Sequence, residues 1–114
     1  MYKIMLNKKD VVGINKEFDK GEFINESSLD YAINISKRTN SWIKQLAHLI
    51  RAILIDHVFK GGNKRTAAAL IATYLNFKGY NHKPEEINKL IIKVLKNNII
   101  DINKIERLIE NVIK

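Results

Sequence analysis

Hydrophobic residues recur along this chain at the three- and four-residue spacing of amphipathic helices. The pattern predicts six helices, which are residues 7–18, a helix capped at 25–27, residues 42–59, residues 63–78, a helix that begins at Pro84, and a helix capped by Asp101. Strand signals are weak and allow at most a short hairpin near residues 20–26 or 36–42. We therefore expect an all-α fold, a compact six-helix bundle.

The predicted third helix, residues 42–59, is apolar well beyond the width of a surface stripe, so we expect it to be central and buried on most sides. His57 falls in its last turn. Gly61 and Gly62 then turn the chain into the fourth helix, which we expect to end at Gly79. The two apolar helices thus meet at one glycine turn.

Length and composition limit the number of domains, the chemistry and the location that we expect. The 114 residues form one domain, residues 1–114, and the absence of cysteine excludes disulfides and thiolate metal sites. We find no signal peptide and no apolar run of about 18 residues, so we expect a cytoplasmic protein without a membrane partner. The net charge of +8 fits an anionic partner, but it equally fits lysines on solvent-facing helix surfaces.

The glycine turn has the features of a phosphate site. Gly61 and Gly62 let the backbone approach a ligand closely, and Asn63 begins a helix whose first N–H groups lack partners within the helix. Such donors and the helix dipole both favour an anion. Lys64 and Arg65 add two full charges, and an arginine can bind a phosphate through two donors.

Three further residues complete this candidate site. His57 can act as a general base toward an attacking hydroxyl, because imidazole exchanges protons near neutral pH. Thr66 can donate a hydroxyl to a phosphate. Phe59 is best read as a structural anchor that packs the loop into the core. On chemistry alone, a plain turn with solvated cations is as good an explanation.

The order of these residues resembles the signature of the Fic/Doc family. The matching stretch is His57-x-Phe59-x-x-Gly62-Asn63-Lys64-Arg65-Thr66-Ala67. Residues 25–32 resemble the family's segment over the active site, and residues 76–80 resemble the end of the helix after the motif. The resemblance covers about residues 8–82 and implies the family's all-α bundle, with the motif loop between two central helices. It also implies transfer from ATP, as co-substrate, to a protein hydroxyl.

Two positions favour the Doc branch over the Fic branch. Lys64 stands where Fic proteins have a second glycine, and Ala68 stands where they have a second arginine. The resemblance therefore implies a toxin of a toxin–antitoxin system that transfers a phosphate to a target such as a translation elongation factor. AMP transfer, an AMPylation, is the less favoured reaction.

Gly61 departs from the family pattern, which has an acid at this position to bind Mg²⁺. Lys60 has the wrong sign to replace it, and on a helix Asp56 would point about 100° away from His57. No metal ligand is therefore intact. Three explanations remain open: a toxin whose acid was replaced, a metal held by substrate and water, or an inactive pseudo-enzyme that binds nucleotide or protein. Under the first, an acid restored at position 61 raises activity.

The chain also lacks the inhibitory helix of many Fic proteins. The nearest match, residues 106–111, has no serine or threonine at the required position, and Ala68 removes the arginine that the inhibitory glutamate would bind. We therefore expect an antitoxin supplied as a separate protein. A small nucleic-acid-binding protein is the least favoured reading, because the positive residues are scattered.

Overall fold

The computed structural model describes residues 6–113 and confirms the all-α fold. Its helices are α1 (Lys8–Asn15), α2 (Glu26–Ser36), α3 (Trp42–Leu54), α4 (Asn63–Phe77), α5 (Pro84–Lys96) and α6 (Ile102–Ile113). No strand forms within residues 6–113, so the short hairpin that the sequence at most allowed is absent there. In the same range, an isolated antiparallel bridge joins Phe23 to Phe59. No helix of this range is both long and apolar enough to cross a bilayer.

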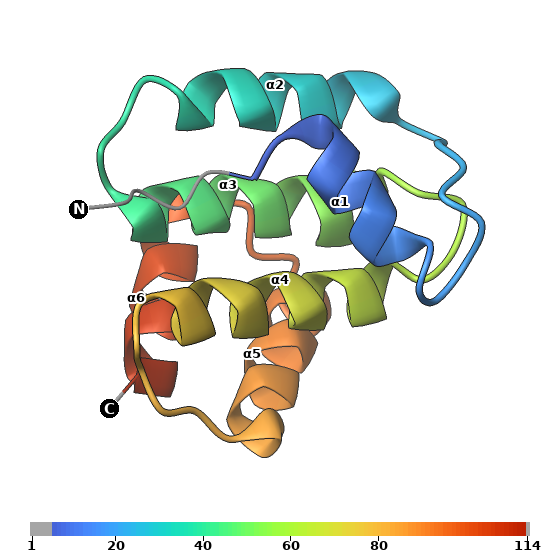
Figure 1. The fold of residues 1–114 in the computed structure, drawn as a ribbon. Coiled ribbons are helices and arrows are strands. Elements are labelled where there is room, and N and C mark those ends of the chain that lie inside the picture. Colours follow the sequence, from blue (N-terminus) through green and yellow to red (C-terminus); the bar gives the residue numbers. More distant parts are fainter. Residues whose placement is uncertain (1–5, 114) are drawn as a thin grey trace.

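Helix α3 forms the centre of the molecule, as its wide apolar face predicts. In Figure 1 it runs between α2 and α4, while α5 and α6 pack on the side away from α2. Ser41 begins the helix by accepting a hydrogen bond from the Lys44 backbone N–H at 3.2 Å. The buried residues of α3 are Gln45, Leu46, Ala47, Leu49, Ile50, Ala52, Ile53 and Leu54.

Several expected helix boundaries are confirmed. Gly79, with a φ of 79°, follows the end of α4, and Pro84 is the first residue of α5. Asp101 precedes α6 and accepts a hydrogen bond from the Asn103 N–H at 2.8 Å. Helix α1 is shorter than predicted, because it ends at Asn15 and residues 16–18 form a turn.

The predicted end of the third helix was wrong. Helix α3 ends at Leu54, so His57 lies beyond it and not in its last turn. The N–H groups of Ile55 and Asp56 both bond to the Arg51 carbonyl, which closes the helix. The periodic pattern did not reveal this end, because apolar residues continue past it into an irregular segment.

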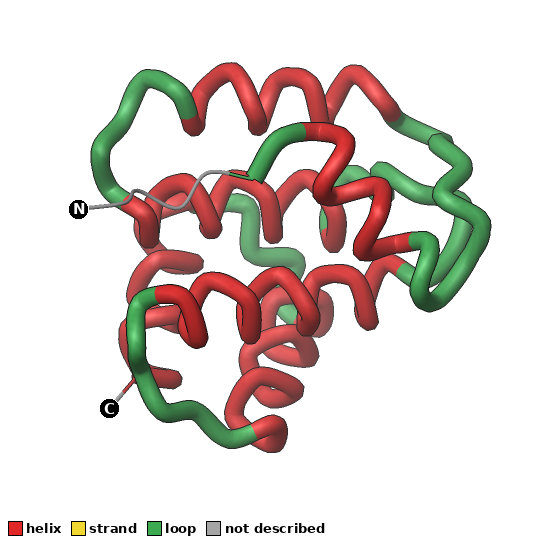
Figure 2. The backbone as a smooth tube through the Cα atoms, in the orientation of Figure 1, coloured by secondary structure: helices red, strands yellow, loops and turns green. Residues whose placement is uncertain are grey.

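The residues after α3 form backbone hydrogen bonds with the loop after α1 and do not continue the helix. The carbonyl of Val58 accepts from the N–H groups of Ile24 at 2.8 Å and Asn25 at 3.1 Å, and the Lys60 N–H donates to the Glu22 carbonyl at 2.9 Å. The loop after α1 and the loop before α4 therefore lie side by side, as Figure 2 shows. This pairing places residues 19–25 against the glycine turn.

Candidate functional site

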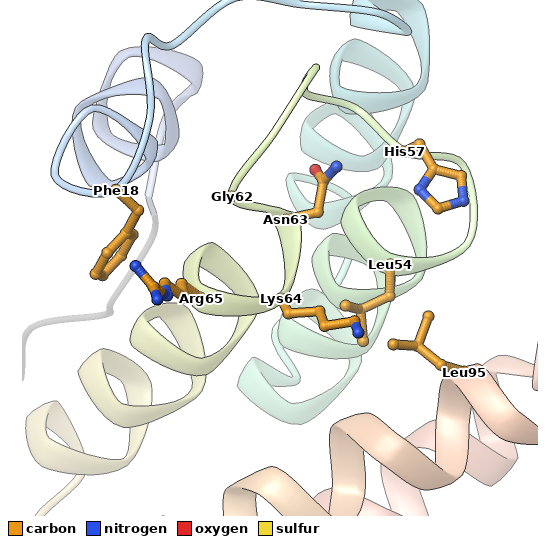
Figure 3. Close-up of a pocket in the computed structure, with 8 residues that line it drawn as sticks. All are labelled: Phe18, Leu54, His57, Gly62, Asn63, Lys64, Arg65 and Leu95. Carbon is orange, nitrogen blue, oxygen red and sulfur yellow. The ribbon is translucent and has the colours of Figure 1, made fainter.

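A cavity of about 430 Å³ lies at the junction of α3 and α4 (Figure 3). It brings together five of the predicted site residues with three apolar ones. Its lining residues are Phe18, Leu54, His57, Gly62, Asn63, Lys64, Arg65 and Leu95. A base and two cations thus share one cavity of a size that suits a small ligand.

His57 adopts a backbone conformation that is rare for residues other than glycine. Its φ is 53° and its side chain is exposed. Neighbouring bonds hold the segment, since Asn25 Nδ2 donates to the Asp56 carbonyl at 3.2 Å and the Asp56 carboxylate accepts from Ser28 Oγ. Such strained backbone is concentrated at functional sites. Figure 3 places the imidazole across the cavity from Phe18 and Arg65, where it can take a proton from a bound hydroxyl.

The start of α4 forms the cationic side of the cavity. Gly62 precedes the helix in the left-handed conformation, with a φ of 73° that only glycine adopts freely. Within the part of the chain that the structure describes, no side chain caps the N–H groups of this first turn, and no acidic residue lies in it. The uncapped N–H groups, together with Lys64 and Arg65, therefore make this end of the helix a favourable position for an anion.

The side chains of Lys64 and Arg65 extend toward different parts of the cavity. Successive helical residues point about 100° apart, and in Figure 3 Lys64 extends toward Leu54 and Leu95, whereas Arg65 extends toward Phe18. Arg65 also lines a neighbouring groove whose wall is made by small residues of α4, Ala68, Ala69 and Ala72. Arg65 therefore stands at the boundary between the polar cavity and an apolar groove.

Asn63 and Phe59 hold the motif loop in shape. The amide of Asn63 donates to the Phe59 carbonyl and accepts from the Phe59 N–H. The Phe59 side chain is fully buried and stacks on Phe23, with ring centroids 5.4 Å apart. Phe59 thus has the placement expected of an anchor, and the side chain of Asn63 is engaged by the loop.

Thr66 does not line the cavity, although we expected it among the phosphate-binding residues. Its side chain is fully buried, and its hydroxyl accepts a hydrogen bond from Asn15 Nδ2 at 3.0 Å. Gly61 is likewise absent from the lining, and its carbonyl accepts from the same Asn15 Nδ2 at 2.9 Å. Asn15 Nδ2 therefore bonds to both residues, and neither lines the cavity.

Asn15 is a residue that the sequence reasoning missed. It is fully buried, and its Oδ1 accepts from the Gly21 N–H at 2.9 Å in addition to the two bonds that its Nδ2 donates. It follows Val11 by four positions and so shares the apolar face of α1. A polar residue on an apolar helix face is the signal that could have identified it.

The space beside Gly61 is filled by a carboxylate from another segment. A Cβ built on Gly61 would lie 2.9 Å from Oδ2 and 3.1 Å from Oδ1 of Asp19. A side chain at position 61 would therefore require the Asp19 carboxyl group to move, a contact between segments that no local sequence pattern indicates. Within residues 6–113 no cluster of three acidic or histidine side chains could enclose a metal ion. Mg²⁺ bound to nucleotide needs only one or two carboxylates, and one is present here.

Comparison with known proteins identifies one relationship. The family model described as "Fic/DOC family" matches residues 8–75, which is more than half of the chain. The match includes α1 to α3, the loop that carries His57 and most of α4. No curated protein and no solved structure matches the chain.

Proposed function

Because this chain belongs to the Fic/Doc family, we propose that it transfers the terminal phosphate of ATP to a hydroxyl group of a target protein. The observation that carries this proposal is the position of His57, which lines the same cavity as the uncapped start of α4, Lys64 and Arg65. A base for the acceptor and a binding site for the donor phosphates are thereby adjacent.

The residues of the cavity suit each part of the reaction. The N–H groups at the start of α4, with Lys64 and Arg65, bind the phosphates and oppose their charge. The oxygen of the target hydroxyl attacks the γ-phosphorus, and His57 accepts the hydroxyl proton. The bond between the γ-phosphorus and the bridging oxygen breaks, and ADP leaves with that electron pair. Bound Mg²⁺ supplies further neutralisation of the phosphate charge.

Two positions support phosphate transfer over AMP transfer. Lys64 occupies a glycine position of the Fic signature, and its side chain fills space beside Leu54 and Leu95 (Figure 3). Ala68 supplies no second arginine, and it lines the apolar groove instead. Positive charge on α4 is thereby concentrated in its first turn, which favours a γ-phosphate near His57. A role as a toxin with a separate antitoxin, acting on a translation factor, follows from the resemblance to the Doc branch.

Gly61 favours a second candidate function. Without a carboxylate at the family's metal position, the same cavity can bind nucleotide or a partner protein without turnover. ATP binding with no transfer of label would identify that pseudo-enzyme.

Labelled ATP tests the proposal. The protein is incubated with a bacterial lysate, Mg²⁺ and ATP labelled at either the α- or the γ-phosphate. We expect a lysate protein to acquire label from γ-labelled ATP alone. Label acquired from α-labelled ATP would establish AMP transfer and contradict the proposal.

A further inference from the structure

Asp19 occupies the space that a side chain at position 61 would need. The atoms nearest to a Cβ on Gly61 are those of the Asp19 carboxyl group, at 2.9 to 3.1 Å. Gly61 does not have the positive φ that makes glycine necessary at Gly62. The lack of a side chain at position 61 therefore leaves room for the carboxylate of Asp19, and the backbone conformation there does not require glycine.

Asn15 fixes Asp19 against the glycine turn. The Asp19 N–H donates to the Asn15 carbonyl at 2.8 Å, and the Gly21 N–H donates to Asn15 Oδ1 at 2.9 Å. Asn15 Nδ2 donates to the Gly61 carbonyl at 2.9 Å. One buried side chain therefore holds the backbone of Gly21 and of Gly61, so the fold keeps the backbone of Asp19 next to the glycine turn.

The Asp19 carboxylate is available for a ligand. Across residues 6–113 it takes part in no hydrogen bond and no ion pair, whereas the neighbouring Glu22 pairs with Lys60 at 3.7 Å. Asp19 also lies close to the start of the proposed phosphate site, because a Cβ on Gly62 would be 3.2 Å from Asp19 Cβ, although Asp19 is not among the residues that line the cavity. An unpaired carboxylate next to bound phosphates is the environment in which Mg²⁺ is held.

We propose that Asp19 supplies the carboxylate for the nucleotide-bound divalent cation, in place of the acid that position 61 lacks. This inference rests on the proposed function, since the cation is the one that accompanies ATP. Under this assignment the protein is a family member whose metal-binding carboxylate comes from the loop after α1.

Calorimetric titration with ATP, once in EDTA and once in Mg²⁺, tests this assignment without any measurement of activity. We expect Mg²⁺ to tighten ATP binding by the parent protein and Asp19→Asn to lose roughly tenfold of the affinity in Mg²⁺. In EDTA, Asp19→Asn should bind ATP at least as tightly as the parent, because the substitution removes a negative charge next to the phosphates. The matched control is Glu17→Gln, which removes an exposed carboxylate from the same turn and should bind as the parent does.

A relocation variant completes the test. In Asp19→Ala combined with Gly61→Asp, the carboxylate returns to the motif in the space that Asp19 has left, and we expect the effect of Mg²⁺ to return. An equal effect of Mg²⁺ on the parent and Asp19→Asn would overturn the assignment while leaving the nucleotide site intact. Loss of binding by Asp19→Asn in EDTA as well would also overturn it. Absence of ATP binding by the parent in both conditions would instead refute the proposed function, and the role of Asp19 with it.

Discussion

Asn63 and Phe59 are joined by two hydrogen bonds of opposite direction. The Phe59 N–H donates to Asn63 Oδ1 at 3.1 Å, and Asn63 Nδ2 donates to the Phe59 carbonyl at 2.8 Å. The pair closes the loop between the buried anchor and the first residue of α4. The cavity therefore depends on Asn63 for its shape as well as for the N–H group at the start of the helix.

Replacing Asn63 should loosen this loop. Asn63→Ala removes both bonds and leaves two part-buried backbone groups of Phe59 without these partners, so we expect a loss of about 1–3 kcal/mol in the free energy of unfolding. Urea denaturation measures it. Asn34→Ala, at an exposed position of α2, is the control. Equal stability of the two variants would show that the loop does not need this pair.

Asn15 should matter for both stability and ligand binding. Asn15→Leu keeps the approximate size of the side chain but deprives Gly61, Thr66 and Gly21 of their partners. We expect unfolding to be easier by about 2–3 kcal/mol, because buried polar groups lose their bonds. We also expect weaker ATP binding at temperatures where the variant is folded. Calorimetric titration below the unfolding transition separates the two effects, and unchanged affinity there would contradict a role in shaping the site.

We expect Arg65 to contact the phosphates of ATP and not its nucleoside. Arg65→Gln should weaken ATP binding by roughly tenfold and leave the binding of adenosine unchanged, because the guanidinium interacts with phosphate oxygens. Higher ionic strength should reduce the difference between the variant and the parent. Arg107→Gln, on an exposed position of α6, serves as the control. Equal losses for ATP and adenosine would place Arg65 at the base or the sugar instead.

His48 should make the stability depend on pH. Burial lowers the pKa of this histidine, and the nearby Arg51 and Lys44 lower it further. The imidazole of His48 therefore binds its proton more tightly in the unfolded chain than in the folded protein. The contribution of His48 to the free energy of unfolding is fully present above its ordinary pKa of about 6.5 and is lost as the pH falls below that value. Urea denaturation on both sides of this pH should show a smaller loss for His48→Gln than for the parent. An identical loss in the two proteins would assign the effect to other groups.

The sequence was most informative where a local pattern determines a helix or the residue at which it begins. The wide apolar face of α3 predicted its central place, and Ser41, Pro84 and Asp101 marked where three helices begin. These signals depend on residues that are neighbours in the sequence, so one sequence is enough to detect them. The motif likewise predicted five residues that line the cavity, whereas Gly61 and Thr66, which were also expected there, do not line it.

Contacts between distant segments could not be predicted in the same way. Helix α3 ends early because Val58 pairs with Ile24 and Asn25, and no periodic pattern records that pairing. Thr66 faces Asn15 and not the cavity, since the path of α1 decides what lies behind the loop. The sequence identified Gly61 as a departure from the motif, but it could not show that the Asp19 carboxyl group approaches this position, because a motif contains only neighbours in sequence.

The role of His57 is the central claim, and His57→Asn tests it most directly. Asparagine tolerates the positive φ at this position, so the variant should unfold at the temperature of the parent. Asparagine cannot accept the hydroxyl proton, so we predict that the rate of γ-phosphate transfer to the target protein falls by at least about 100-fold. A folded His57→Asn protein that transfers phosphate at the parent's rate would contradict the account.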